Sequence, residues 1–456
     1  MTPELLQLLK AATEEQLKML VASLYGIDDV VDQRIESVLL TSNPPALARQ
    51  LNERINTIAR STGYIDYKHV AEFNQTFDIL LDDIARTIDV APKHAFELVD
   101  RFMSIHESVY EQVDDSDGDI GAIYAQALEV WLKAARRWRE SSDCSLDWST
   151  ELMARHNDNG YAVWDDLIAG SGELLTKDEL MQLSERFEKA FKRARKAPAN
   201  RGYNAEAATA ALGIAEVAKA LGDVKMFERS ILIDSPKPNE LQKQSIIKFC
   251  LNVNDGESAL QWLQGTWDTR FEDEKLSLLD ATYVVLGRHQ ELLELRRSAY
   301  QKCPDHWHLM PLLEILPENE KPAMLDKALA NALKIPNLQS RIDTLIACHG
   351  ITEAKEQIIK HISQLDVFYG TLLRWAEVFH HAEQRLAEAA CYRLLLEDIL
   401  ASGRSKAYHH AEDYYRQLAQ LDTGIEDYDP LPPWQEYQAK LRQQHGRKYS
   451  FWQRLD

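Results

Sequence analysis

Cations, imidazoles and a hydroxyl gather in two short segments near the C-terminus, where they could together bind an anion. The first segment holds an arginine, a lysine, a tyrosine and a histidine, and the second holds a histidine, an arginine and a lysine. These seven candidate binding residues are Arg404, Lys406, Tyr408, His409, His445, Arg447 and Lys448. Guanidinium and ammonium groups are natural donors to a carboxylate or a phosphate, so their clustering in an acidic chain predicts a binding site. The pattern assigns no catalytic residue and no metal ligand.

The spacing of Arg404 and His409 also resembles the Arg-x4-His motif of helical ribonucleases of the HEPN type. In those enzymes the arginine and the histidine act together on the phosphodiester. The same spacing recurs at Arg101 and His106, so in a chain with 14 histidines we interpret it as coincidence. A helical ribonuclease that depends on His409 remains an alternative hypothesis.

Other motifs that could carry metal or cofactor chemistry are incomplete. Clustered carboxylates suit calcium, but when the acidic loop 114–119 is fitted to an EF-hand, Val113 and Tyr124 fall where the motif needs Asp and Glu. The sequence has no HExxH, no GxxxxGK[ST], no GxSxG and no strand-linked GxGxxG. Neighbouring histidines occur at 306 and 308, 380–381 and 409–410, where one ion is hard for adjacent helical side chains to share. We therefore expect no metal and no cofactor.

Two basic segments stand out in the acidic chain, at 185–201 and in the tail. The first lies on a predicted helix whose Phe187 and Phe191 face inward, and the second interleaves cations with Tyr449, Phe451 and Trp452. Basic and aromatic side chains together are typical of single-strand binding. The alternative is that the tail aromatics dock onto the last hairpin while the cations pair with local acids, and we favour it. A nucleic-acid-associated role through 185–201 or 404–448 remains the second hypothesis.

The composition excludes several classes of protein. The 456 residues carry 72 acids against 52 Lys and Arg, a formal charge of −20, which argues against a general duplex-binding surface. Five cysteines lie far apart without a CxxC, as expected of small core residues in a reducing compartment. No apolar run approaches the ~20 residues of a membrane span. We expect a cytoplasmic protein without a membrane partner.

The elements that must position these residues are predicted to be helices. Only 18 Gly and 15 Pro occur, and the chain is rich in helix formers. Residues 4–24 predict one amphipathic helix with a leucine-rich side. Residues 120–139 predict another, whose stripe at steps of three and four is Ile120, Tyr124, Ala127, Leu128, Trp131, Leu132, Ala135 and Trp138. No period-2 strand pattern appears, so the fold class is all-α.

The order of breaks predicts a bundle followed by a repeat array. Polar, irregular residues at 140–160 mark the best domain boundary, and a weaker one lies at 198–202. From 203 onward, breaks recur every 31 to 34 residues or so, a period typical of stacked helical hairpins. We predict an N-terminal helical domain over 1–145, a connecting helical segment over 146–202, and a TPR-like α-solenoid of degenerate hairpins over 203–456 that ends in a basic aromatic tail.

Several segments resemble an uncharacterised bacterial all-helical family, domain-of-unknown-function family 6880. The segments that carry the resemblance are 392–400, 403–408, 445–448, Phe451-Trp452, Gly222-Asp223-Val224, 114–118 and 161–164. Relatives with similar tails carry an N-terminal SWIM-type zinc finger, but its CxC…CxH spacing is missing here, so zinc binding is not carried over. The resemblance implies a helical-repeat fold without an assigned activity.

Together these patterns favour a non-enzymatic scaffold or adaptor. We expect it to bind another protein through its solenoid surface, with nucleic acid as the less favoured partner. The sequence leaves the partner's identity, the oligomeric state and any bound small molecule open.

Overall fold

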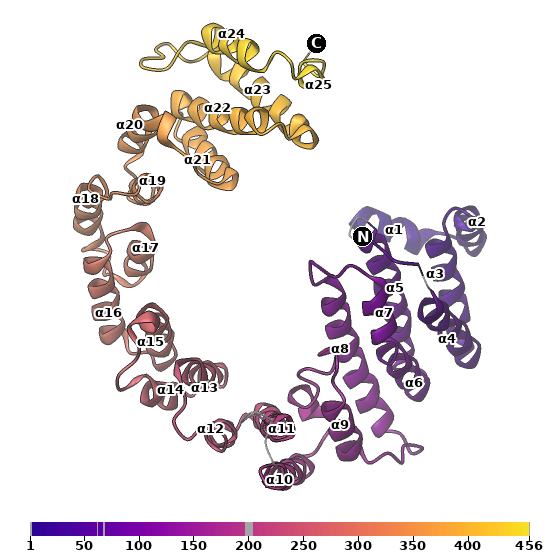
Figure 1. The fold of residues 1–456 in the computed structure, drawn as a ribbon. Helices are drawn as coiled ribbons and strands as arrows, with labels where there is room; N and C mark the ends of the chain where they lie inside the picture. Colours follow the sequence, from indigo (N-terminus) through magenta and orange to yellow (C-terminus); the bar gives the residue numbers. More distant parts are fainter. Residues whose placement is uncertain (1, 62, 67–68, 197–203, 456) are drawn as a thin grey trace. The chain divides into compact units, whose positions relative to one another are not determined.

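In a computed structural model, which describes residues 2–61, 63–66, 69–196 and 204–455, the chain forms two compact units, 1–278 and 279–456 (Figure 1). The all-α prediction is confirmed, since the described residues contain 25 α-helices and a single isolated β-bridge, between Ile65 and Val113. In the described part of the chain, none of the helices combines the length and apolar character needed to cross a membrane.

In its described residues, the first unit contains fourteen α-helices and the first part of a fifteenth, within which the division falls. They are α1 (Pro3–Ala11), α2 (Glu14–Leu24), α3 (Asp29–Leu39), α4 (Pro44–Arg60), α5 (Val70–Thr87), α6 (Pro92–Met103), α7 (His106–Gln112), α8 (Asp119–Arg139), α9 (Trp148–Asn157), α10 (Lys177–Ala194), α11 (Ala205–Leu221), α12 (Val224–Leu232), α13 (Glu240–Asn252), α14 (Gly256–Leu263) and α15 (Glu272–Leu286), with short 3-10 turns at Leu40–Ser42, Ala169–Glu173 and Thr269–Phe271. The predicted boundaries near residues 145 and 202 both lie inside this unit, and residues 197–203 fall outside the described part of the chain.

The second unit continues the succession of helices. It contains α16 (His289–Lys302), α17 (His306–Ile315), α18 (Lys321–Ala332), α19 (Leu338–Ala347), α20 (Ile351–His361), α21 (Tyr369–His381), α22 (Arg385–Ala401), α23 (Tyr408–Asp422), α24 (Trp434–His445) and α25 (Tyr449–Trp452), with 3-10 turns at Ile362–Gln364 and Ser405–Ala407. Consecutive helices such as α16 and α17, α19 and α20, and α21 and α22 pack together, and α17 also packs on α19. This pairing is compatible with the predicted helical hairpins.

The amphipathic stripe of α8 becomes the core of the first unit, as the sequence predicts. Trp131 is fully buried and Trp138 nearly so, and both rings pack on Phe96 of α6 at centroid distances of 5.1 and 5.0 Å. The Trp131 indole donates to Asp100 at 2.8 Å, which satisfies its buried N–H. Apolar side chains at helical spacing therefore identified this core face correctly.

The N-terminal segment differs from its prediction, because residues 4–24 form two helices rather than one. Ala12 ends α1, and Thr13 caps α2 by accepting from the backbone N–H of Gln16, whose side chain accepts in turn from the Thr13 backbone. This reciprocal capping box satisfies two otherwise unpaired donors and starts a new helix. The Thr-x-x-Gln signal is present in the sequence but is hidden inside a continuous leucine pattern.

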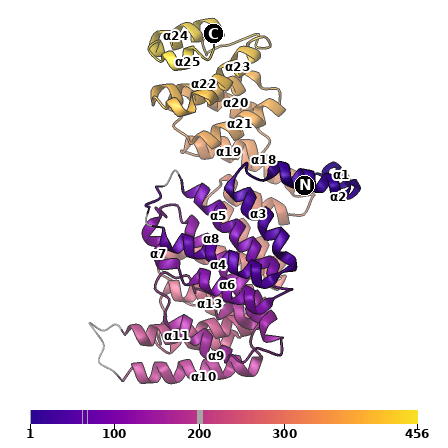
Figure 2. The ribbon, with the colours of Figure 1, turned by 90° about the vertical axis from the view of Figure 1, so that its right-hand side faces the viewer.

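Helices α10 and α11 lie side by side in both views (Figure 1 and Figure 2) and approach closely at Gly213. A β-carbon at Gly213 would lie 2.5–2.6 Å from carbons of the buried Phe187 ring. Gly213→Ala is expected to destabilise the first unit by about 1–2 kcal/mol. Overpacking costs about 1–3 kcal/mol, and the higher helix propensity of alanine offsets about 0.5–1 kcal/mol of that cost.

Urea denaturation of the full chain measures this effect. Gly160→Ala is the matched control, because no atom lies within 4 Å of its added carbon, and it should change the unfolding free energy by less than about 0.5 kcal/mol. Equal stability of the two variants would show that the Phe187 ring moves aside freely.

Candidate functional site

The structure brings part of the predicted C-terminal cluster together at the loop before α23. The Nζ of Lys448 lies 3.1 Å from the position that a β-carbon on Gly403 would take, so the tail lysine covers this loop. The guanidinium of Arg404 pairs with Asp398 at the end of α22. Burial, followed by the charge of Lys448, lowers the pKa of His445 below its usual value. Lys448, His445 and the 403–407 loop therefore share one region.

The other predicted residues occupy different environments. Tyr408 is buried, 4% exposed, and its ring packs edge-on against Phe451 at 5.9 Å, so it belongs to the core of the second unit. Lys406, His409 and Arg447 are exposed. An exposed cation in water offers an anion only a weak, salt-sensitive attraction. Within this cluster, Lys448 is the tail cation that the structure places at the 403–407 loop.

Both Arg-x4-His pairs have local structural partners. Arg404 is engaged by Asp398, and Nδ1 of His409 lies 3.0 Å from the Lys406 carbonyl oxygen in its own loop. In the other pair, Arg101 donates to Asn56 at 3.1 Å, and Nδ1 of His106 lies 2.8 Å from the carbonyl oxygen of Met103. Neither arginine is hydrogen bonded to its histidine, although all four side chains lie in the described part of the chain.

The basic helix α10 carries its own acids. Lys189 lies 3.8 Å from Glu185 and Lys192 lies 3.7 Å from Glu188, each one turn apart, and Arg195 lies 3.6 Å from Asp234. Phe187 and Phe191 are buried, as predicted. Residues 197–201 of the predicted basic segment lie outside the described residues. Three of the six cations in the described part of this segment, Lys189, Lys192 and Arg195, therefore have acidic partners nearby.

The tail aromatics also have partners in the second unit. Phe451 is fully buried and Trp452 is 6% exposed, whereas Tyr449 is 72% exposed. The Trp452 indole donates to the His445 carbonyl at 2.9 Å, and the Arg442 guanidinium lies 4.8 Å from the centroid of the Trp452 ring. Two of the three aromatic side chains are therefore docked, and Tyr449 alone is available to stack on a base.

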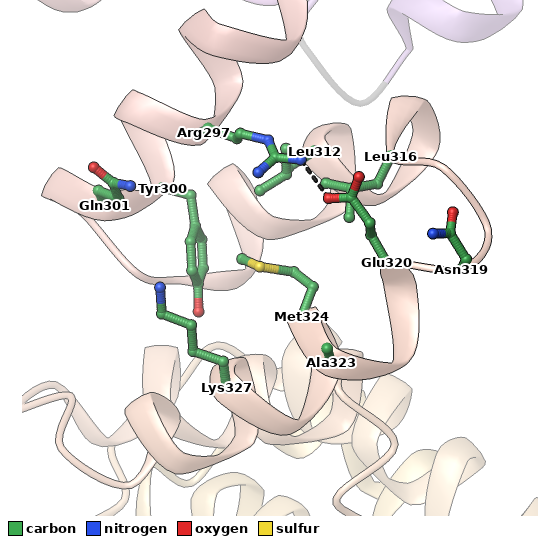
Figure 3. Close-up of a pocket in the computed structure, with 10 residues that line it drawn as sticks. All are labelled: Arg297, Tyr300, Gln301, Leu312, Leu316, Asn319, Glu320, Ala323, Met324 and Lys327. Carbon is green, nitrogen blue, oxygen red and sulfur yellow. Dashed lines mark hydrogen bonds and ion pairs between the residues drawn. The ribbon is translucent and has the colours of Figure 1, made fainter.

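A pocket that the sequence did not reveal lies between α16, α17 and α18 and has a volume of about 330 Å³ (Figure 3). Its apolar floor consists of Leu312, Leu316, Ala323 and Met324. Arg297 and Glu320 form an ion pair on one side, and the amino group of Lys327 points toward Tyr300 on the other. Burial raises the pKa of Tyr300, and Asn331 partly opposes this shift. The buried Tyr300 hydroxyl has no hydrogen-bond partner of ordinary geometry among the described residues. The pocket could hold a small apolar group with an anionic end.

A larger apolar groove lies between α2 and α3 in the first unit. The groove has a volume of about 610 Å³, and its apolar lining consists of Leu17, Val21, Ala22, Tyr25, Ile35 and Leu39. Helix α2 has no buried residue, and Figure 2 shows α1 and α2 at the edge of their unit. The sequence identified the leucine side of this segment but not that it stays uncovered. We call this site the N-terminal groove.

Acidic groups edge the N-terminal groove. Glu36 on α3 accepts from the Tyr25 hydroxyl at 2.9 Å and from the Gln50 amide at 2.6 Å, so its carboxylate is held in place. Glu14 on α2 pairs with Lys18 at 2.7 Å. The described lining of the groove thus combines an apolar surface with carboxylates at its border.

One known protein family matches nearly the whole chain. A family model described as a family of unknown function (DUF6880) matches residues 9–454. The chain belongs to this family. The match covers nearly all of both units, so the resemblance, carried by segments between residues 114 and 452, extends over nearly the whole chain. No curated protein matches the chain. The family brings no assigned activity, so the roles of individual residues rest on their geometry.

Proposed function

We propose that this protein is a non-enzymatic helical-repeat adaptor that binds another protein, and that the N-terminal groove anchors the partner. The observation that carries the proposal is the concentration of exposed apolar side chains. Eleven of the 26 large hydrophobic residues that are exposed in the described part of the chain lie within residues 1–39. A contiguous apolar surface bordered by polar groups marks an interaction site, whereas single exposed apolar residues are ordinary.

The chemistry of the groove favours an amphipathic helix as its occupant. A groove between two helices accepts the apolar face of a third, with anchors at i, i+3, i+4 and i+7. The carboxylates of Glu14 and Glu36 border the apolar lining, and the whole chain carries a net charge of −20. A partner helix with basic residues along its edges would complement this border.

The hairpins of the second unit supply further exposed apolar side chains for such a partner, in line with the solenoid surface expected from the sequence. In Figure 1, α17, α19 and α21 lie along one side of this unit, and α16, α18 and α20 lie along the other. Trp307 and Met310 on α17 are 74% and 47% exposed, and Tyr369 on α21 is 53% exposed. Aromatic and methionine side chains are enriched in protein interfaces.

Replacing Leu17 with aspartate tests the role of the groove. We expect the variant to capture about tenfold less partner, or still less, in a pull-down from source cells with mass spectrometry. The reason is that a leucine buried against the partner contributes about 1.5–3 kcal/mol to binding. Leu17 is 39% exposed and belongs to a helix without buried residues, so the fold should tolerate the change.

Leu241→Asp is the matched control, because Leu241 is 60% exposed on α13, outside the groove, and its variant should retain the partner. Unchanged capture by Leu17→Asp would contradict the proposal. Capture that nuclease treatment removes would favour the nucleic-acid alternative, with binding that falls steeply with salt. RNA cleavage lost in His409→Ala but kept in His106→Ala would favour the ribonuclease alternative.

A further inference from the structure

Three side chains capable of binding a metal converge at the turn between α16 and α17 in the second unit. Cys303, Asp305 and His308 each offer one ligand atom, and these three atoms lie within 4.8 Å of one another. The Cys303 Sγ donates to Oδ2 of Asp305 at 3.2 Å, and Nδ1 of His308 lies 2.7 Å from Oδ1 of Asp305. The carboxylate therefore stands between a thiol and an imidazole.

The local backbone fixes this arrangement before any ion binds. Cys303 is the C-cap of α16, and Asp305 is the N-cap of α17. Oδ1 of Asp305 accepts from the backbone N–H of His308 at 3.1 Å, which orients the carboxylate toward the first turn of α17. The caps of two helices thus hold all three donors within six residues of chain.

We propose that Cys303, Asp305 and His308 form a binding site for a divalent ion of borderline softness, with Zn²⁺ as the best match. Thiolate, carboxylate and imidazole are the three ligand types that Zn²⁺ takes in proteins. With bonds of about 2.3 Å to sulfur and about 2.0–2.1 Å to nitrogen, a tetrahedral ion places these two ligand atoms about 3.6 Å apart. The three ligand atoms already lie within 4.8 Å of one another, so the side chains have to close by no more than about 1.2 Å.

Charge favours the same ion. A Cys303 thiolate and the Asp305 carboxylate carry two negative charges, which Zn²⁺ neutralises. The partly positive N-terminus of α17 therefore does not repel the neutral complex. Binding releases the Cys303 thiol proton to solvent, while Nδ1 of His308 coordinates through its neutral lone pair. Asp305 exchanges its contacts with the thiol and the imidazole for a bond to the ion.

The exposure of Cys303 leaves one side of the site open. Cys303 is exposed, whereas Cys250, Cys348 and Cys391 are buried. Three protein ligands around tetrahedral Zn²⁺ leave a fourth position for water or for a donor from another molecule. The site is thus accessible to added metal in the intact protein.

Titration of the full chain with Co²⁺, after chelator treatment, tests the proposal. We expect one Co²⁺ per chain, a thiolate-to-cobalt charge-transfer band, and displacement of that band by one equivalent of Zn²⁺. Cys303→Ser should abolish the band, and His308→Ala should weaken metal binding by about tenfold or more because one of three ligands is lost.

Cys144→Ser is the matched control, because it removes a partly exposed thiol elsewhere in the chain and should leave the band intact. Far-ultraviolet circular dichroism of each variant confirms that the helices persist. Absence of a thiolate band, or a band of equal intensity in Cys303→Ser, would overturn the proposal and leave Asp305 as a helix cap alone.

Discussion

Replacing Asp83 with alanine is expected to destabilise the first unit by about 3–5 kcal/mol, the range measured when one partner of a buried ion pair is removed. Asp83 on α5 is 2% exposed. Its two oxygens accept from Arg34 on α3 at 2.6 Å and from Arg54 on α4 at 2.9 Å. One carboxylate thus joins three helices, and its removal deprives the Arg34 and Arg54 guanidinium groups of their buried acidic partner.

The neighbouring Asp82 provides a matched control. Asp82 also pairs with Arg34, at 3.1 Å, but its side chain is 57% exposed. Because water screens this pair, Asp82→Ala should cost less than about 1 kcal/mol. Urea denaturation, combined with amide hydrogen exchange of α3, α4 and α5, assigns the change to the first unit. Equal losses in the two variants would contradict the role of burial.

Replacing Trp375 with alanine should destabilise the second unit by a similar amount, about 3–5 kcal/mol, as is usual for a large aromatic residue in a core. Trp375 on α21 is 1% exposed, and its indole N–H donates to Asp343 of α19 at 2.7 Å. The substitution leaves a cavity and also removes one donor to a buried carboxylate that keeps only Arg374 at 2.8 Å among its described partners.

Trp307→Ala is the control, because it makes the same substitution at an exposed position of the same unit. Trp307 on α17 is 74% exposed, so its removal should change the unfolding free energy by less than about 0.5 kcal/mol. Denaturation monitored by hydrogen exchange of α19–α22 separates the second unit from the first. A loss at Trp307 as large as that at Trp375 would mean that exposure does not govern the energetics of this unit.

If the proposed adaptor function is correct, exposed aromatic residues such as Trp307 are expected to contribute to binding rather than to stability. A variant that leaves the fold intact and still reduces partner capture would mark the second unit as part of the interface. The N-terminal groove and the hairpins of the second unit can be separated in this way, because Leu17 and Trp307 each contribute little to their cores.

Two amphipathic segments show how far sequence periodicity reaches. Residues 120–139 and residues 4–24 both carry apolar side chains at steps of three and four. In α8 this side is buried against α6 and α5, whereas in α2 the same kind of side lines an open groove. Periodicity specifies which face of a helix is apolar, but not whether another element covers that face.

The sequence also revealed only part of the candidate sites. The sequence identified the cations of the C-terminal cluster, but it could not show that Tyr408 is buried or that Lys448 covers Gly403. It noted the histidines at 306 and 308 only as neighbours on a helix. The proposed ligand set instead combines His308 with a thiol and a carboxylate across a helix boundary, which a search for histidine pairs does not detect.

By itself, the sequence determined that the chain is helical and which faces of its amphipathic segments are apolar. These properties are local, because breakers, caps and side-chain periodicity act within a few turns of the backbone. Only the tertiary structure decided that Asp83 joins three helices, that Tyr300 faces a pocket, and that the leucines of α2 stay exposed. Burial depends on contacts between residues far apart in the chain, and no local pattern specifies them.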